Sequence, residues 1–481
     1  MSKYNKRNKT LKRRNKFDTS LCDDKMTFQD CEMAILRQSI KDNEKIRGRK
    51  IVSNEDIQKI IKIVENFIIK KKLICYGGTA INNILPDDAQ FYDKEAEIPD
   101  YDFFSANAFD DAIELADIYY NAGYIDVEAK AGMHHGTYKV YVNFIPIADI
   151  TQLVKPLFDS IKKQTIKKAG IHYTPPNYLR MSMYLELSRP EGDISRWEKV
   201  LKRLNLLNKY YPLTADNCDK IDFQRKLDTH MEGNEKIYTI TRDVFVDEGL
   251  IFFGGYASGL YSRYDDKPHQ KMMKIPDFDV LSDDPERTAL ILKEQLEEAG
   301  IKHIKIKQND KIGEVVPENY EVIIGKEDTI AIIHKPIACH SYNQLTIDGR
   351  KIKVASIDTI MSLYLCFIYV DSDLHSTRLL CMAKYLFDIQ ERNKLNQKGL
   401  LKRFTSKCYG TQETLESIRS EKSNKYKELK SAPNSREYQE WFLKYTPGEK
   451  ATKAKTKKLL QKEDKPIKGN KILKILGLEV Y

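Results

Sequence analysis

Two aspartates one residue apart, Asp100 and Asp102, have the clearest chemical potential in this sequence. They lie in the segment PDYDFF at residues 99–104. On a β-strand, residues i and i+2 share a face, so both carboxylates would point the same way while aromatic neighbours pack behind. Adjacent carboxylates on an apolar strand repel each other and lose hydration, and a divalent cation removes both penalties. Mg²⁺ binds a few carboxylate oxygens together with substrate phosphates, so the pair indicates metal-dependent phosphate chemistry.

A third aspartate, Asp149, stands alone in an apolar segment. It follows NFIPIA at residues 143–148, which has the composition of a buried strand. A single buried charge needs a partner. We expect Asp149 to be the third metal ligand; the alternative is a strand-end aspartate or a member of an ordinary ion pair.

A glycine pair, Gly77 and Gly78, follows a short apolar strand at residues 73–76 and precedes Thr79. Glycines let backbone amides approach an anion closely, and the N-terminus of the following helix adds free donors and a favourable dipole. This arrangement predicts phosphate binding, whereas the alternative is a tight strand-to-helix turn that uses the glycines for steric reasons alone.

Two helices are expected before this strand. Apolar residues recur at helical spacing from Asp24 to about Arg47, and Ser53-Asn54 is a good start for a second helix that ends at the lysines 70–72.

Four further polar residues follow the aspartate pair. His134 and His135 precede Gly136 and are expected in a hairpin turn rather than as a ligand pair. Lys130 and Lys139 are expected on a solvated strand face, with phosphate contact as the alternative.

An internal repeat organises the chain. Residues 73–105 contain LICYGGTAIN and IPDYDFFS, and residues 250–282 contain LIFFGGYASG and IPDFDVLS. Gly77 and Gly254 are equivalent, as are Asp102 and Asp279, each pair being 177 residues apart. A second echo links residues 176–185 with residues 356–365. Two motifs repeated at one separation predict a duplicated domain.

The second copy keeps Asp277 and Asp279 but lacks the third carboxylate. Alignment of the segments 138–142 and 320–324 places Ala331 opposite Asp149, inside the apolar run TIAII at residues 329–333. We therefore expect a retained fold without catalysis in this copy.

These motifs resemble those of the polymerase-β-like nucleotidyltransferases: a GG[ST] turn, a D-x-D strand and a third aspartate on a neighbouring strand. More narrowly, residues 50–390 resemble the poxvirus-type poly(A) polymerase catalytic subunit, most closely its giant-virus versions. The separation of Gly78 from Asp100 is longer than in the minimal motif, which requires an insertion at about residues 86–97. The resemblance implies an α/β fold of two tandem nucleotidyltransferase-like domains, each a mixed sheet flanked by helices.

The resemblance also implies roles for individual residues. Asp100 and Asp102 would hold two Mg²⁺ or Mn²⁺ ions, and Asp149 would complete the site of the catalytic ion. The phosphates of ATP would be bound by the glycine turn, that is by Gly77, Gly78 and Thr79. The implied reaction is template-independent addition of AMP to an RNA 3′ end, with a homodimer or a processivity subunit as partner.

Five segments are expected along the chain. They are a basic arm and helix at 1–50, a catalytic domain at 51–212, a connector at 213–236, a degenerate nucleotidyltransferase-like domain at 237–390 and a basic C-terminal extension at 391–481. Residues 1–16 contain eight Lys or Arg and no acid, and residues 391–481 contain 23 Lys or Arg against 11 Asp or Glu. The two ends thus carry net charges of +8 and +12, whereas the whole chain carries +10. Residues 17–390 therefore have a net charge of −10. Basic ends suit a polyanionic acceptor.

The composition excludes several classes. Among the 481 residues no apolar run is long enough to span a membrane, and the basic N-terminus lacks the apolar region of a secretory signal. Eight scattered cysteines without a CxxC pair make disulfides and structural zinc unexpected. We therefore expect a reduced, cytoplasmic protein and, for a viral protein, a place in the host cytoplasm or the virion. Two functional alternatives stay open: a nucleotidyltransferase with another nucleotide or acceptor, and a non-catalytic RNA-binding accessory subunit.

Overall fold

The computed structural model describes residues 19–23, 25–221, 223, 234–265, 278–370 and 373–448. Four sequence-based expectations lie outside these residues. They concern the basic arm 1–16, part of the connector 213–236, Asp277, and the Lys-rich segment after Gly448.

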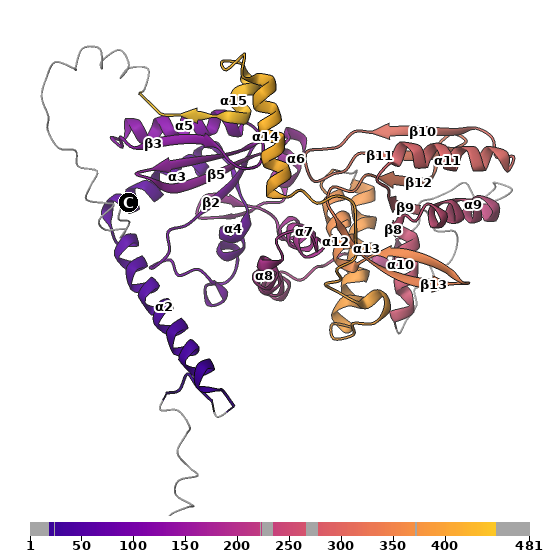
Figure 1. Ribbon diagram of the computed structural model, residues 1–481, viewed down its shortest axis with the longest axis horizontal. Helices are drawn as coiled ribbons and strands as arrows, with labels where there is room; N and C mark the ends of the chain where they lie inside the picture. The colour runs from indigo at the N-terminus through magenta and orange to yellow at the C-terminus, as the bar shows by residue number, and fades with distance from the viewer. Residues whose placement is uncertain are drawn as a thin grey trace, which may run out of the picture.

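Two helices begin the described chain, as the periodicity predicts. Helix α2 (Phe28–Val52) projects away from the body of the molecule (Figure 1). Helix α3 (Glu55–Lys71) is capped by Asn54, whose side chain accepts a hydrogen bond from the backbone NH of Asp56. Its buried stripe, which includes Ile57, Ile60 and Val64, packs on the first sheet. None of the described helices is both long and apolar enough to cross a bilayer.

The first sheet is mixed and has eight strands in the order β16-β3-β4-β5-β2-β1-β7-β6. Strand β2 runs parallel to β5 and antiparallel to β1, while β1 runs parallel to β7. The strands are β1 (Ile74–Cys75), β2 (Tyr101–Ser105), β3 (Val127–Ala131), β4 (Thr137–Val142), β5 (Ile145–Gln152), β6 (Ile166–Lys168), β7 (Ile171–Tyr173) and β16 (Lys444–Tyr445). Helices accompany it at α4 (Gly77–Ile84), η2 (Asp87–Ala89), α5 (Ala108–Asn121), α6 (Lys155–Lys163), α7 (Pro176–Leu187), η3 (Ile194–Arg196), α8 (Trp197–Tyr210) and η4 (Cys218–Lys220).

The second sheet repeats this topology in the order β10-β11-β12-β9-β8-β14-β13-β15. Its strands are β8 (Ile251–Phe253), β9 (Phe278–Leu281), β10 (Ile304–Asn309), β11 (Asn319–Ile324), β12 (Asp328–His334), β13 (His340–Ile347), β14 (Arg350–Ala355) and β15 (Cys408–Tyr409). Its helices are α9 (Asn234–Asp247), α10 (Gly254–Tyr261), η5 (Ser262–Tyr264), α11 (Pro285–Glu298), α12 (Ile357–Phe367) and α13 (Asp373–Arg392). Seven strands of each sheet correspond in order and direction, which confirms the tandem α/β fold expected from the repeat.

The two copies meet through equivalent helices, α7 and α12, which pack against each other between the sheets (Figure 1). The rings of Tyr178 and Tyr369 contact edge to face at a centroid distance of 5.3 Å. The hydroxyl of Tyr184 donates to Oε1 of Gln390 over 3.0 Å. The domains therefore share a buried interface, and it is formed by the similar segments 176–185 and 356–365 of the repeat.

The described part of the C-terminal extension is ordered structure that returns to the first domain. After η7 (Gly399–Leu401) and β15 it forms α14 (Leu415–Leu429), α15 (Arg436–Phe442) and β16. In Figure 1 this segment, coloured yellow, crosses from the second domain to the outer edge of the first sheet. Arg436 binds the carboxylate of Asp110 through two hydrogen bonds of 2.8 and 3.0 Å, and Tyr445 donates to Asp117 over 2.6 Å. One extension thus adds an edge strand to both sheets.

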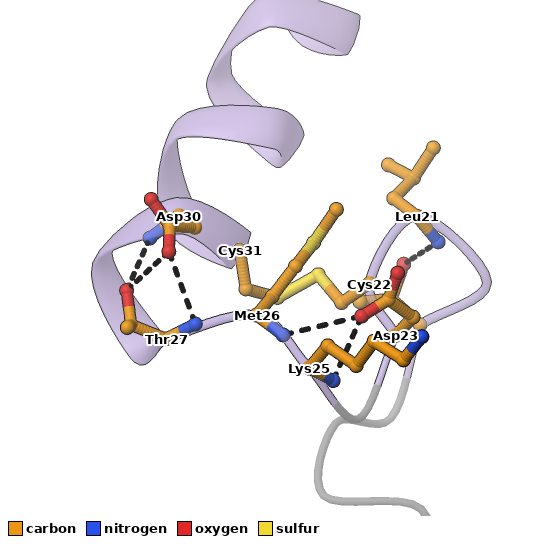
Figure 2. The surroundings of a disulfide bond; sticks show 9 residues. Leu21, Cys22, Asp23, Lys25, Met26, Thr27, Asp30 and Cys31 are labelled. Atoms are coloured by element: carbon orange, nitrogen blue, oxygen red, sulfur yellow. Dashed lines mark hydrogen bonds between the residues drawn. A yellow bond between two sulfur atoms is a disulfide. The ribbon is translucent and has the colours of Figure 1, made fainter.

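The expectation that the cysteines are unpaired is wrong for six of them. Disulfides join Cys22 to Cys31, Cys218 to Cys381 and Cys339 to Cys408, with Cα–Cα distances of 5.3, 5.5 and 5.1 Å. Figure 2 shows the first of these beside the cap of α2, where the Thr27 side chain accepts a hydrogen bond from the Asp30 backbone. The other two close loops of 163 and 69 residues, so chain spacing alone could not reveal them.

Candidate active site

The three predicted aspartates gather on two neighbouring strands. Asp100 immediately precedes β2, and Asp102 lies within it directly opposite Asp149 of the parallel strand β5. The side chain of Asp100 is exposed, whereas Asp102 and Asp149 are half-buried. Residues two apart on β2 share a face, so the fold brings together the carboxylates that spacing singled out.

Burial and mutual repulsion mark this cluster electrostatically. Desolvation, together with the nearby carboxylates of Asp100 and Asp149, raises the pKa of Asp102 to about 7. Desolvation and the charge of Asp149 also raise the pKa of Asp100. Both shifts mean that the cluster is short of positive charge, which a divalent cation would supply.

Lys139 is placed differently from the sequence-based expectation. Its ammonium group binds a carboxylate oxygen of Asp149, because the two residues are direct neighbours on the antiparallel strands β4 and β5. Lys139 thus belongs to the carboxylate cluster rather than to a solvated face. Lys130 fits the original expectation: it lies over the ring of Tyr141 and beside Glu128 on the outer part of the sheet.

Gly77 has a positive φ of 70° and supports the second aspartate. A Cβ atom at this position would lie 2.8 Å from a carboxylate oxygen of Asp102, so a side chain would collide with the site. In the second copy Gly254 has a φ of 73° and stands in the same relation to Asp279. The first glycine is therefore required both for the turn and for the close approach of the aspartate.

Gly78 lies beneath a cation that the sequence did not reveal. A Cβ atom there would lie 2.4 Å from the hydroxyl of Tyr92 and 2.9 Å from a guanidinium nitrogen of Arg203 on α8. Arg203 donates to the Tyr92 hydroxyl over 2.7 Å and stacks over Phe91. Among the described residues Arg203 has no carboxylate partner, so its charge is available at the glycine turn.

Three hydroxyl groups complete the surroundings of the aspartate cluster. Thr79 donates to the backbone oxygen of Asp100 over 2.6 Å, which fixes the aspartate at the start of β2. The hydroxyl groups of Tyr76 and Thr151 share a hydrogen bond of 2.9 Å, and Thr151 lies two residues beyond Asp149 on the same face of β5. Tyr76 was missed because an aromatic residue at the end of a strand carries no distinctive spacing.

The remaining predictions for this region have clear outcomes. His134 and His135 lie in the turn between β3 and β4, as expected, and the His135 ring packs against Trp441 at 4.2 Å. The carboxylate oxygens of the three aspartates do not all lie within 4.8 Å of one another. Within the described residues the one tighter group of possible ligands is Glu191 with Cys339 and Cys408, whose sulfurs are joined in a disulfide.

The second copy differs at the position of the third aspartate. Asp279 on β9 lies opposite Ile332 on β12, so Ile332 and not Ala331 is the equivalent of Asp149. The alignment was wrong by one residue because the hairpin before β12 has three loop residues, 325–327, where the first copy has only Asn143 and Phe144. An apolar side chain replaces the carboxylate in either alignment.

Other members of the cluster are also exchanged in the second copy. By strand pairing, Glu321 of the second copy is equivalent to Lys139 of the first, and His334 is equivalent to Thr151. Phe253 replaces Tyr76 at the end of the first strand. The rings of Phe253 and Phe367 lie 5.1 and 5.3 Å from the ring of His334, so aromatic packing occupies this region.

The fold and the site define two tandem α/β domains with mixed sheets of the same order, of which the first carries three aspartates beside a glycine turn. Residues 62–193 match the family model described as poly(A) polymerase catalytic subunit, and this range contains every predicted site residue.

Curated relatives point the same way. A protein of African swine fever virus (isolate Tick/Malawi/Lil 20-1/1983) named "Putative poly(A) polymerase catalytic subunit" is 38% identical over 164 residues, which cover 33% of this chain and 34% of the relative. The Acanthamoeba polyphaga mimivirus protein of the same name is 31% identical over 217 residues, covering 43% and 35%. The matched part thus spans about a third of the length of these relatives.

A solved structure extends the likeness of fold over 95% of the chain. The crystal structure of the Megavirus polyadenylate synthase has a TM-score of 0.73 and 18% identity, and the match covers 95% of this chain and 94% of that one. The resemblance to viral poly(A) polymerase catalytic subunits is confirmed: the family model matches residues 62–193, and the likeness of fold extends over 95% of the chain.

Proposed function

We propose that this chain is a template-independent poly(A) polymerase that adds AMP from ATP to RNA 3′ ends. The observation that carries the proposal is the placement of Asp102 directly opposite Asp149 on parallel strands, with Asp100 beside them after a glycine turn. The match of residues 62–193 to the poly(A) polymerase catalytic subunit family supports the choice of reaction.

The carboxylate cluster fits divalent cations. Asp100 and Asp102 would hold two Mg²⁺ or Mn²⁺ ions, and Asp149 would complete the site of one, because hard cations prefer such oxygen ligands. When bound, the ions would lower the pKa of the RNA 3′-hydroxyl and neutralise charge on the triphosphate and the departing pyrophosphate. The raised pKa values of Asp100 and Asp102 support this assignment, since both carboxylates gain from added positive charge.

The glycine turn and Arg203 would bind the triphosphate. Helix α4 begins at Gly77 and no side chain caps its N-terminus, so its first amides would be available to an anion, as at other helix N-termini. Arg203 lies over Gly78 and would add a fixed, planar donor for phosphate oxygens. Thr79 would contribute mainly by holding Asp100, because its hydroxyl already donates to that residue.

Lys139 would hold Asp149 in position before metal binds. Its ammonium group neutralises the Asp149 carboxylate. A divalent cation bound near Asp149 would displace this ammonium group, and Lys139 would then be free to contact phosphate. In the second domain no described carboxylate stands at the position of Asp149, which supports a fold that has lost catalysis.

The acceptor and partners follow from the same proposal. The acceptor would be RNA, in keeping with the basic ends of the chain, and mRNA 3′-end polyadenylation in the host cytoplasm or the virion would be the setting. A homodimer or a processivity subunit would keep RNA bound between additions. An enzyme of this superfamily acting on another nucleotide or acceptor is the second candidate.

A primer-extension assay tests the proposal. The protein is incubated with a labelled RNA oligonucleotide, each NTP singly, and Mg²⁺ or Mn²⁺. We expect extension with ATP alone, and its loss in Asp100→Ala. Extension with another NTP would keep the site and change the substrate, while no extension under any condition would contradict an RNA-directed enzyme.

A further inference from the structure

A disulfide of the second sheet lies beside a carboxylate of the first domain. Cys339 immediately precedes β13, Cys408 begins β15, and the disulfide joins these two neighbouring strands. A carboxylate oxygen of Glu191 and the two sulfurs all lie within 4.8 Å of one another. Three atoms of the kinds that bind metal ions therefore meet at one place, although they come from three separate segments of the chain.

The loop that carries Glu191 is held against the start of β13. It connects α7 to η3. The backbone NH of Ser341 donates to the backbone oxygen of Ser188 over 2.8 Å. The backbone NH of Gly192 donates to the backbone oxygen of Arg189 over 3.0 Å and closes a turn around Glu191. The place of this carboxylate beside the sulfurs is thus fixed by backbone contacts within the loop and between the domains.

The Glu191 side chain has no other contact that would explain its position. It is exposed, and it forms no hydrogen bond or ion pair with a described residue. The disulfides Cys22–Cys31 and Cys218–Cys381 have no third ligand at a comparable distance among the residues that the structure describes. The combination of two sulfurs with an unpaired carboxylate is therefore particular to this disulfide within the described chain.

The charges at this place favour a divalent cation once the sulfurs are reduced. Two thiolates and one carboxylate would bring three negative charges together, and a divalent cation would lower the net charge to −1. Burial and the charge of Arg189 lower the pKa of His340, the residue after Cys339. The guanidinium of Arg189 therefore lies close enough to offset the remaining negative charge.

The ligand types select zinc. Thiolate sulfur favours Zn²⁺ over the hard cations Mg²⁺ and Ca²⁺. With Zn–S bonds of about 2.3 Å and Zn–O bonds of about 2.0–2.2 Å, the ligand atoms of a tetrahedral site lie about 3.3–3.8 Å apart. The three atoms already lie within 4.8 Å of one another, so rotation of the side chains is enough to bring them to one ion.

We propose that Cys339, Cys408 and Glu191 bind one Zn²⁺ ion when their disulfide is reduced. A dithiol supplies two electrons and two protons: the S–S bond of the protein breaks, two thiols form, and the dithiol becomes a cyclic disulfide. Zn²⁺ then replaces both thiol protons, which pass to water, and forms two Zn–S bonds and one Zn–O bond. A water molecule would take the fourth position.

The oxidised and the zinc-bound states would join different parts of the molecule. The disulfide joins β13 only to β15, within the second sheet. Zn²⁺ would add Glu191, which belongs to the first domain. In a compartment that keeps thiols reduced, the metal would therefore link the two domains and the C-terminal extension, and in an oxidising one the disulfide would exclude it.

Cobalt(II) binding to the full chain tests this inference. Thiolate ligands give Co²⁺ an intense charge-transfer absorption that the carboxylates of the aspartate cluster cannot produce. The protein is reduced with dithiothreitol, freed of it by gel filtration without oxygen, and titrated with Co²⁺ and then Zn²⁺. Cys339→Ser and Cys408→Ser each remove one sulfur, and Glu191→Gln removes the carboxylate. Cys218→Ser in another disulfide and Glu198→Gln, an exposed glutamate of α8, are the matched controls.

We expect the reduced wild type to bind one Co²⁺ ion with thiolate absorption, and Zn²⁺ to displace it. The oxidised protein should show no such absorption. Each variant at Cys339 or Cys408 should weaken Co²⁺ binding at least about 100-fold, and Glu191→Gln at least about tenfold, since changes around a metal ligand already cost about 10- to 100-fold. Both controls should change the affinity less than twofold.

Two results would overturn the proposal: no thiolate absorption in the reduced wild type, or wild-type Co²⁺ affinity in both cysteine variants. If the cysteine variants fail to fold, Glu191→Gln decides, because its side chain is exposed and its exchange leaves the core intact. Unchanged Co²⁺ affinity in this variant, with an unchanged melting temperature, would also overturn the proposed ligand set. None of these measurements uses ATP or RNA, so their outcome is independent of the proposed function.

Discussion

Lys139 and Asp149 form an ion pair across the neighbouring strands β4 and β5, and this pair supplies a positive charge inside the cluster of three aspartates. Each side chain is only partly exposed, at 34% for Lys139 and 19% for Asp149. The pair therefore controls the charge that a metal ion would meet.

The first prediction concerns this pair. Lys139→Gln should lower the melting temperature in EDTA, because removal of the cation leaves the carboxylates to repel one another, at a cost of about 1 kcal/mol for a half-exposed pair. Mg²⁺ should then stabilise the variant more than the wild type. Differential scanning fluorimetry in EDTA and in Mg²⁺ measures both effects, and Lys130→Gln on the outer sheet should behave as wild type. An equal Mg²⁺ response in all three proteins would contradict the prediction.

The second prediction compares the two copies. Asp102→Ala should reduce ATP incorporation by at least about a thousandfold, whereas Asp279→Ala should change it less than threefold, since Asp279 faces Ile332 and not a carboxylate. Steady-state rates with a short RNA primer measure this. Comparable losses in the two variants would show that the second site is active.

The third prediction concerns Arg203. Arg203→Ala should lower kcat/KM for ATP about 10- to 100-fold, because a charge-assisted contact to the triphosphate is lost. Arg203→Lys should recover part of this loss, since the charge remains but the planar fork does not. Lys202→Ala, the adjacent exposed residue, should have no effect. Equal activity of Arg203→Ala and wild type would exclude Arg203 from the phosphate site.

The fourth prediction concerns the disulfide between Cys218 and Cys381. It closes a loop of 163 residues, so its loss should increase the entropy of the unfolded chain and destabilise the protein by roughly 2–4 kcal/mol. Cys218→Ser should melt several degrees below the wild type in buffer without reductant. A reductant should lower the melting temperature of the wild type more than that of the variant; the reverse order would refute a stabilising bond.

The fifth prediction concerns acid stability. His340 is fully buried, and neither ring nitrogen has a hydrogen-bond partner among the described residues. Burial, together with the nearby charge of Arg189, lowers its pKa to about 3 from an ordinary value of 6.5. The fold therefore holds the neutral form, and its stability should fall as the pH drops from 6.5 toward 3, by about 2 kcal/mol at pH 5.

His340→Leu removes that titrating group. Between pH 7 and pH 5 its melting temperature should fall less than that of the wild type, as measured by scanning fluorimetry in a buffer series. Identical slopes for the two proteins would mean that His340 does not control acid stability.

The domain boundaries expected from the sequence, at residues 51–212 and 237–390, stay proposals, yet the repeat itself correctly anticipated two sheets of the same order. Asp100 and Asp102 could be selected from the sequence because local spacing on a strand fixes which side chains share a face, and Asp149 because it is a single charge in an apolar segment. Gly77 could be selected because a turn between strand and helix favours glycine. These are properties of short segments, and they can be predicted from the residues of the segment alone.

Tertiary structure decided the contacts between segments that lie far apart in the chain. Arg203 reaches Tyr92 across 111 residues, and Arg436 reaches Asp110 across 326. One extra residue in a hairpin placed Ile332, rather than Ala331, opposite Asp279. Such pairings depend on how whole sheets and helices pack together, which no local periodicity encodes. The sequence by itself therefore identified the three aspartates and the duplication. Tertiary packing decided which cationic side chains lie beside the aspartates.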